Sequence, residues 1–270
     1  MKKFTMSFML LCAFLMVLSG CGNSDQTSGK NKEEKKILRV VTNAAYSPME
    51  FIDKGEVKGF DMDLITAVAK EAGYDVKLEH VGWDPIFVEL DEERAQIGAA
   101  AITINEDRKQ SYEFTVPYFH ASQKILVPEG SSIKSAADLK GKVVAVQMGT
   151  TANIVMEKLL GANNKNIKKF ENNNLAIMEM TKGGADAVVA DNAVVEEYAK
   201  NNPTDKLVVI EDKETFAPEF YGFMLSKGND KLKKELDEAL NTLFDNGEYT
   251  KIYQKWMGLE PDVEFLKQQQ

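Results

Sequence analysis

The sequence predicts an α/β fold of two lobes, each with a central sheet flanked by helices, joined by two hinge crossings. Short β-branched runs alternate with amphipathic helical stretches, a rhythm that favours parallel sheets with helices on their faces. The rhythm restarts after Pro128, so that two such units follow one another along the chain. Two more amphipathic helices come last, and we expect them to return to the first lobe.

The first unit begins with a β-branched run that is typical of a buried strand. In the helix that follows, Leu64 and Val68 share one face, Asp61 or Asp63 can cap the start, and Gly73 can end the helix. For this unit we predict strands at 37–42, 76–80 and 97–102 and helices at 61–73 and 84–90.

The second unit repeats the pattern, and the tail adds two helices. The first tail helix places Leu232, Leu236, Leu240 and Leu243 on one stripe, and Gly247 ends it. We predict strands at 143–147, 167–170, 187–190 and 207–210, helices at 151–160, 175–181 and 193–199, and tail helices at 231–246 and 248–256.

If the tail returns to the first lobe, the chain crosses between the lobes twice. We expect these crossings near residues 123–127 and 221–225. Lobe 1 then comprises residues 37–124 plus 224–262, and lobe 2 comprises residues 125–223. Two crossings form a hinge, so the lobes can close on a ligand between them.

The N-terminus carries an export signal. Two lysines precede an apolar run at 8–17 that is too short to span a bilayer comfortably, and a small-residue cleavage site follows. Leu18-Ser19-Gly20-Cys21 resembles the lipobox of bacterial lipoproteins, which implies cleavage after residue 20 and a lipid on Cys21 at the outer face of the cell membrane. The alternative is an ordinary signal peptide with an incidental cysteine. The polar stretch up to residue 36 is a predicted flexible tether.

Charge and cysteine content exclude several classes of protein. The chain has 33 basic and 42 acidic side chains and a formal net charge of −9. An acidic surface disfavours nucleic acid as a partner, because phosphates require a basic face. After cleavage Cys21 is the single thiol, so no internal disulfide and no cysteine metal cluster can form. We expect no metal and no cofactor.

Ligands of open α/β sheets lie beyond the carboxyl ends of the strands, so the residues there are the candidates. Gly149, Thr150 and Thr151 follow one strand and precede a helix, whose free N–H groups and partial positive charge suit a carboxylate. Asp191 follows another strand and can accept from an ammonium group. The alternative for each is a helix cap.

Arg108 is the candidate partner for a ligand carboxylate in the first unit. The chain contains three arginines, Arg39, Arg94 and Arg108, and Arg108 lies in what we predict to be a short polar turn just beyond the strand at 97–102. Its planar guanidinium matches a carboxylate with two parallel hydrogen bonds. The alternative is a surface arginine paired with a nearby acid.

Two aromatic residues and a run of alanines complete the predicted site. Tyr46 follows the first strand and Trp83 precedes a helix, so either can pack on a ligand side chain or, alternatively, in the core. Ala100 and Ala101 keep the floor small and can offer backbone carbonyls to an ammonium group. Together with the groups above, they form a predicted binding site for a zwitterion. A bound zwitterion can then hold the two lobes closed.

Several motifs in a fixed order resemble those of the bacterial solute-binding proteins of the polar amino-acid class. The first is Gly59-Phe60-Asp61-Met62-Asp63-Leu64, and the resemblance runs from about residue 37 to 258. The other motifs are Thr103–Arg108, Pro117-Tyr118, Asp138–Lys142 and Gln147–Thr151. The resemblance implies a two-lobed periplasmic-binding-protein-like (Venus flytrap) fold, a monomer, and an importer with separate permease and ATPase chains.

The resemblance also implies roles for nine residues and a ligand, a free polar amino acid. Arg108, Thr151 and Thr103 are assigned to the ligand carboxylate. Asp191 and Ala101 are assigned to its ammonium group. The contacts of the ligand side chain are assigned to Tyr46, Trp83, Asn43 and Gln147.

Within the class the chain looks most like receptors for basic amino acids, arginine first. Those receptors often carry an acid where this chain has Asn43, so glutamine and cystine stay open as ligands, unless Glu50 or another acid compensates. A second alternative is an enzyme, since some proteins of this fold are cyclohexadienyl or arogenate dehydratases. General acid catalysis needs a poised acid or histidine, and we expect the two histidines, His80 and His120, to be structural or exposed. A third alternative is a sensory receptor.

Overall fold

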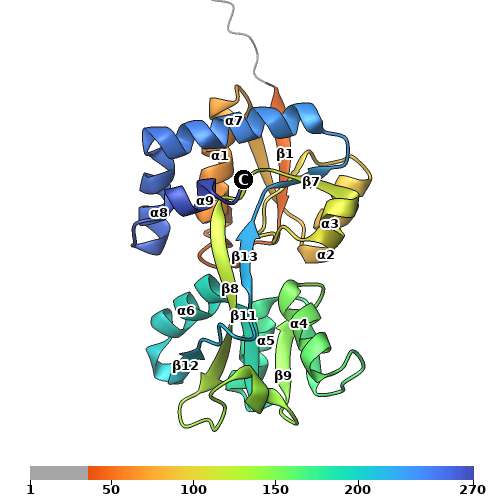
Figure 1. The fold of residues 1–270 in the computed structure, drawn as a ribbon, viewed down its shortest axis with the longest axis vertical. Helices are drawn as coiled ribbons and strands as arrows, with labels where there is room; N and C mark the ends of the chain where they lie inside the picture. Colours follow the sequence, from red (N-terminus) through yellow and green to blue (C-terminus); the bar gives the residue numbers. More distant parts are fainter. Residues whose placement is uncertain (1–35) are drawn as a thin grey trace, which may run out of the picture. The chain divides into compact units, whose positions relative to one another are not determined.

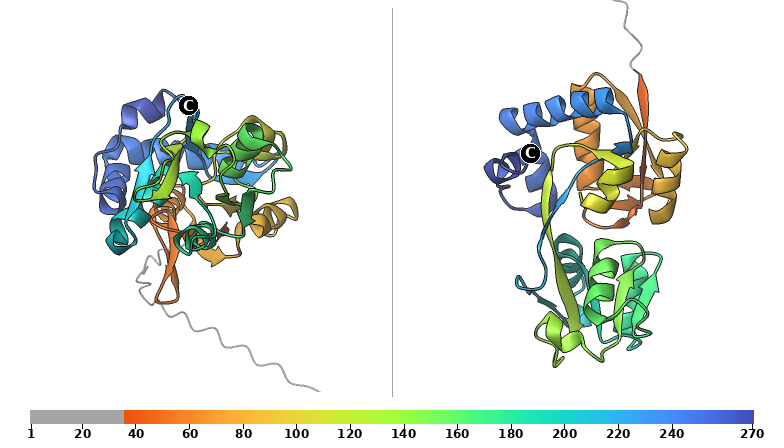
Figure 2. Two further views of the ribbon diagram at one scale, coloured as in Figure 1. Left: turned by 90° about the horizontal axis from the view of Figure 1, so that it is seen from below. Right: turned by 45° about the vertical axis from the view of Figure 1, so that its right-hand side comes forward.

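The computed structural model describes residues 36–270, which lie within one compact unit (Figure 1). The predicted signal peptide, Cys21 and the tether up to residue 35 lie outside the described residues. Two sheets form the centres of two lobes, and β8 (Phe119–Pro128) and β13 (Pro218–Tyr221) run between them (Figures 1 and 2). The predicted two-lobed α/β architecture is therefore confirmed.

The sheet of lobe 1 has the strand order β5-β1-β6-β14-β7, in which β1 is parallel to β5 and β6 while β14 is antiparallel to its neighbours. Its strands are β1 (Ile37–Thr42), β5 (Asp75–His80), β6 (Ile97–Gly98), β7 (Tyr112–Phe114) and β14 (Met224–Ser226). The helices are α1 (Phe60–Glu71), α2 (Trp83–Asp91) and α3 (Glu106–Ser111).

The tail helices pack on lobe 1, as predicted. They are α7 (Asp230–Asn246), α8 (Glu248–Met257) and α9 (Val263–Lys267). Leu236 and Leu240 of the predicted stripe are fully buried and lie in one core with Phe60 and Leu64 of α1. Leu266 of α9 joins the same core, beyond the predicted end of lobe 1 at residue 262. The exact bounds of the lobes stay a prediction.

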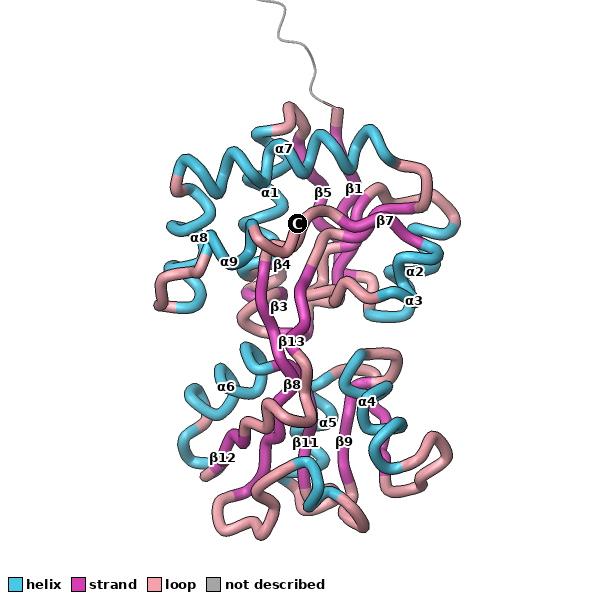
Figure 3. Tube along the Cα trace, viewed as in Figure 1, coloured by secondary structure: helices cyan, strands magenta, loops and turns pink. Residues whose placement is uncertain are grey.

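The sheet of lobe 2 has the order β10-β9-β11-β8-β12, with β13 paired to β8 outside this path. Helices lie on the outside of the strands (Figure 3). The strands are β9 (Val144–Gln147), β10 (Ile167–Phe170), β11 (Ala187–Asp191) and β12 (Leu207–Ile210). The helices are α4 (Thr151–Leu160), α5 (Asn173–Thr181) and α6 (Asn192–Asn201), with short 3-10 turns at Ala136–Leu139 and Pro203–Asp205.

Strands β8 and β13 form the hinge. They are antiparallel, and Phe119 to Ser122 pair with Tyr221 to Pro218. Past Ser122, β8 continues into the sheet of lobe 2, while β13 is soon followed by β14 in lobe 1. The first crossing thus lies slightly before the predicted segment at 123–127. No helix within residues 36–270 is long and apolar enough to cross a membrane.

One hairpin sheet was not predicted. Strands β2 (Ala45–Tyr46), β3 (Glu50–Asp53) and β4 (Glu56–Lys58) form a small antiparallel sheet after β1. Its strands are too short to show an alternating pattern, which is the signal on which a strand prediction depends. The hairpin matters for the site because it carries both Tyr46 and Glu50.

The strand predicted at 97–102 is shorter than expected and ends at Gly98, and the segment that follows it contacts Asp61. The Asp61 carboxylate is buried at the start of α1 and accepts from the backbone N–H of Ala101 (2.8 Å) and from the Tyr118 hydroxyl (2.7 Å). Ala101, three residues beyond the end of the strand, adopts a left-handed conformation with φ +49°. The predicted helix cap by Asp61 or Asp63 is wrong, since residue Gly59 is the N-cap and no side chain caps this helix.

Asp61→Asn is expected to make the protein less sensitive to alkaline pH. Burial raises the pKa of Asp61 to about 7, against the two hydrogen bonds that lower it. A carboxyl group whose pKa is raised on folding favours the folded state at low pH. The free energy of unfolding therefore falls as pH rises from about 4 to about 7, by up to about 4 kcal/mol. The amide still accepts both hydrogen bonds but does not ionise. Urea unfolding at pH 4.5 and 8 should show that Asp61→Asn gains stability relative to the parent at pH 8. Asp63→Asn, on the same helix, should show no such gain. Equal destabilisation of Asp61→Asn at both pH values would contradict the argument.

Candidate ligand-binding site

A polar cavity lies between the lobes. Each of the nine residues to which the sequence assigned a ligand contact lines it. From lobe 1 come Asn43, Tyr46, Trp83, Ala101, Thr103 and Arg108, and from lobe 2 come Gln147, Thr151 and Asp191. They converge because they follow the carboxyl ends of β1, β6, β9 and β11 or open the helix after β5, and these sheet edges face one another across the hinge.

Arg108 is held by local contacts rather than by an ion pair. It lies on α3, not in the predicted polar turn, and the side chain of Asn105 caps this helix by accepting from the Arg108 N–H. The guanidinium donates to the carbonyl oxygen of Thr103 (2.9 Å) and lies over the rings of Trp83 (5.3 Å) and Phe87 (5.8 Å). Burial lowers the pKa of Arg108, while the charges of Glu219 and Asp191 oppose that shift. The guanidinium is thus oriented, with hydrogen-bond donors to spare.

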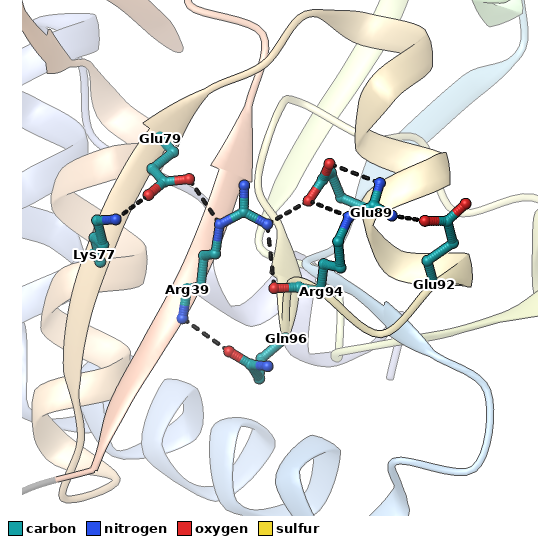
Figure 4. A network of polar contacts seen from close by, with 7 residues as sticks. All are labelled: Arg39, Lys77, Glu79, Glu89, Glu92, Arg94 and Gln96. Atoms are coloured by element: carbon teal, nitrogen blue, oxygen red, sulfur yellow. Dashed lines mark hydrogen bonds and ion pairs between the residues drawn. The ribbon is translucent and has the colours of Figure 1, made fainter.

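The other two arginines are engaged elsewhere, in a network on the outer side of lobe 1 (Figure 4). The Arg39 Nε lies 2.6 Å from Glu79 and its terminal nitrogen pairs with Glu89. Arg94 pairs with the same Glu89 (2.9 Å) and with Glu92. Among residues 36–270 the ion pairs of arginine are these, so the surface-pair alternative applies to Arg39 and Arg94 and not to Arg108.

The start of α4 offers free backbone donors to the cavity. Thr150 is the N-cap, and its hydroxyl accepts from the N–H of Asn153 (3.3 Å). Within the described part of the chain, the N–H groups of Thr151 and Ala152 have no hydrogen-bond partner, and both residues line the cavity. The capping alternative and the anion-binding prediction therefore describe different residues of one helix start.

Asp191 ends β11 and lies buried at the junction of the lobes. Its carboxylate accepts from the hydroxyls of Tyr46 (2.8 Å) and Tyr221 and from the Gln123 amide. Although helix α6 follows directly, the Asp191 side chain makes no capping hydrogen bond. Burial and the charge of Glu219 raise the pKa of Asp191 to about 6, against those hydrogen bonds. A ligand ammonium would relieve the desolvation of this carboxylate.

Trp83 and Tyr46 are both buried and both line the cavity. The Trp83 Nε1 is a buried donor without a partner in residues 36–270, and the Tyr46 hydroxyl donates to Asp191. Their predicted contact with the ligand side chain stays a prediction.

The sequence alone could not place Glu50, and it gave no sign of Asn173, Gln123 or Glu219. Glu50 lines the cavity, is almost fully buried, and its Oε2 has no partner in the described residues. Burial, with the charges of Asp61 and Asp191, raises its pKa well above the usual range. Asn173 also lines the cavity and donates to Gln147 (2.8 Å). The hinge residues Gln123 and Glu219 lie within strands, where no local motif marks a polar side chain as functional.

Gly149→Ala is expected to weaken ligand binding about tenfold by obstructing closure. Gly149 has φ +74°, and a Cβ there would lie 3.1 Å from Trp83 Nε1 and 3.4 Å from Asp84 Oδ1 on the opposite lobe. Gly183→Ala, on the same lobe, is the matched control, because its φ is +78° but no atom lies within 4 Å. Both variants should lose stability through backbone strain, roughly 1 kcal/mol. Titration calorimetry should show weaker binding for Gly149→Ala alone, and equal affinities would contradict the closure argument.

A two-lobed α/β protein with a polar, two-sided cavity at its hinge belongs to the class of solute-binding proteins. The comparison with known families agrees: the chain belongs to the bacterial extracellular solute-binding proteins, family 3, whose model matches residues 38–259. This confirms the family that the motifs suggested.

Three similar proteins illustrate the relationship. A probable histidine-binding protein of Neisseria gonorrhoeae is 40% identical, over 96% of this chain and 97% of its own length. The arginine-, lysine-, histidine-binding protein ArtJ of Geobacillus stearothermophilus is 50% identical with a TM-score of 0.84, over 86% of this chain and 100% of that structure. An ancestral arginine-binding protein bound to arginine is 40% identical with a TM-score of 0.78, over 82% and 98%. These are binding proteins, and the prediction of a binding protein rather than an enzyme is confirmed.

Proposed function

We propose that this protein is the lipid-anchored receptor of an amino-acid ABC importer and that it binds a free basic amino acid, arginine first, between its closing lobes. The observation that carries the ligand class is Glu50, a buried carboxyl group that lines the cavity with an unpartnered oxygen. It supplies the acid that the amide of Asn43 lacks.

The main-chain groups of an amino acid match the two lobes. Its carboxylate pairs with the guanidinium of Arg108 and with the free N–H groups of Thr151 and Ala152. Its ammonium pairs with Asp191 and with the carbonyl of Ala101. Since these groups come from both lobes, a bound amino acid stabilises the closed cleft.

The charges around the cavity favour a cationic side chain. Glu50 and Asp191 line it and Glu219 lies beside it, against one guanidinium, that of Arg108. A zwitterion with a neutral side chain leaves this excess of acid unchanged, whereas a basic amino acid brings one more positive charge. The amides of Gln147 and Asn173, with Nε2 and Oδ1 unpartnered within residues 36–270, can bind the polar end of that side chain.

The relatives support the same ligand class, since one solved neighbour is described as binding arginine, lysine and histidine and another is bound to arginine. The lipid on Cys21 would hold the receptor at the outer face of the cell membrane, beside the permease subunits of the importer that it supplies. The Leu18–Cys21 motif supports the anchor.

Thermal unfolding of the purified protein with each amino acid tests the proposal. A micromolar ligand at millimolar concentration stabilises the folded state by about 4 kcal/mol. We expect large shifts with arginine, lysine, ornithine or histidine. A shift with glutamine or cystine alone would refute the basic ligand but keep the receptor. No shift with any amino acid, or turnover of prephenate or arogenate, would refute the receptor.

A further inference from the structure

A network of polar side chains joins the hinge to the cavity. Its centre is Glu219 on β13, whose Oε2 accepts from the hydroxyl of Thr103 in lobe 1 (2.6 Å) and from the hydroxyl of Thr151 in lobe 2 (2.8 Å). The other oxygen accepts from the amide of Gln123 on the second hinge strand (3.2 Å). The same amide contacts Asp191. One carboxylate therefore touches both lobes and both hinge strands.

This arrangement decides what the two threonines can offer a ligand. A hydroxyl has one proton to donate and two lone pairs with which to accept. Thr103 and Thr151 direct that proton to Glu219, so neither hydroxyl can at the same time donate to a ligand carboxylate. The Gln123 amide nitrogen lies 3.1 Å from the Thr151 oxygen, but its two protons face Asp191 and Glu219, so the Thr151 oxygen keeps lone pairs for a ligand, and both threonines line the cavity.

We infer that Glu219 is a positioning residue for ligand recognition: by taking the hydroxyl protons of Thr103 and Thr151, it turns both oxygens into acceptors for the ammonium group of the ligand. The inference rests on the proposed binding of an amino acid. It leaves the ligand carboxylate to Arg108 and the backbone N–H groups of α4.

The orientation of the Gln123 amide agrees with this arrangement of donors and acceptors. Its nitrogen faces the carboxylates of Asp191 and Glu219, and its oxygen is buried without a partner in residues 36–270. The opposite orientation of the amide would place its oxygen against two acceptors. The protons of Thr103, Thr151 and the Gln123 amide thus point at Glu219 and Asp191. The oxygens of the same side chains remain as acceptors for the ligand.

A double-mutant cycle tests the inference. Glu219→Gln is measured in the parent protein and in a Thr103→Val, Thr151→Val background, with arginine binding followed by calorimetry. Glu214→Gln is the control for the loss of one negative charge, because Glu214 is an exposed acid that precedes β13 on the same segment. We expect Glu219→Gln to weaken binding about tenfold in the parent but less than twofold without the hydroxyls, and Glu214→Gln to have no effect.

The melting temperatures of the same proteins without ligand complete the test. If Glu219 acts through the two hydroxyls, the effects of the substitutions on stability are also non-additive. An equal loss of affinity in both backgrounds would overturn the inference, because Glu219 would then act by its charge alone. If the parent binds no amino acid, the proposed function fails, and additive melting temperatures would independently overturn the role of Glu219.

Discussion

Arg108→Ala is expected to weaken amino-acid binding by about 2–5 kcal/mol, a loss of roughly thirtyfold or more in affinity. The guanidinium is oriented by the Thr103 carbonyl and by two aromatic rings, and the part of the chain that the structure describes gives it no acidic ion-pair partner. Without it, the ligand carboxylate enters a cavity whose other side chains include the acids Glu50 and Asp191. Calorimetric titration of the variant measures the loss.

The matched control is Arg94→Ala. Arg94 belongs to the same lobe, and its side chain is half exposed and paired with Glu89 and Glu92 outside the cavity. It should bind the ligand like the parent. Melting temperatures without ligand separate a loss of binding from a loss of folding. A loss well under about 1 kcal/mol for Arg108→Ala would remove Arg108 from the site.

Glu50→Gln is expected to reverse the ligand preference. A guanidinium or ammonium of the ligand side chain would lose its buried counter-charge, which costs about 2–5 kcal/mol for arginine or lysine. Glutamine, which carries no side-chain charge, should change by less than about 1 kcal/mol. Competition between labelled arginine and unlabelled glutamine measures this difference directly. Glu56→Gln, an exposed acid on the same hairpin, is the control. Equal effects of Glu50→Gln on both ligands would show that Glu50 does not read the side chain.

The pH dependence provides a second test of Glu50. Burial raises the pKa of this carboxyl group, so without a cationic partner it is protonated below that raised pKa. A cationic ligand favours the ionised form and lowers that pKa, which releases a proton on binding. Arginine affinity should therefore increase as pH rises toward the raised pKa and then level off. The slope should be smaller in Glu50→Gln, where Asp191, whose pKa is raised to about 6, still responds to the ligand ammonium, and a parent affinity that falls with rising pH would contradict the assignment.

The sequence marked three strand-end residues that the structure places around the cavity. Thr151, Asp191 and Arg108 follow buried strands, and the apolar periodicity of strands and helices can be recognised along the chain without knowledge of its partners. Once the strands are parallel, their carboxyl ends meet at one edge, so residues far apart in sequence become neighbours. Arg108 was placed correctly in the cavity although its helix was taken for a turn, because the position after the strand, and not the local conformation, decided where it points.

The sequence by itself determined the two-lobed α/β fold and the family, and it pointed to nine of the residues that line the cavity. Tertiary structure alone decided the rest of the site. Glu50 lies on a hairpin too short for any pattern, and its effect depends on burial beside Asp191. Glu219 becomes functional only where two hinge strands and two lobes meet. Burial, and the acceptance of two hydroxyl protons by one carboxylate, are properties of distances in space, and no local pattern of residues encodes those distances.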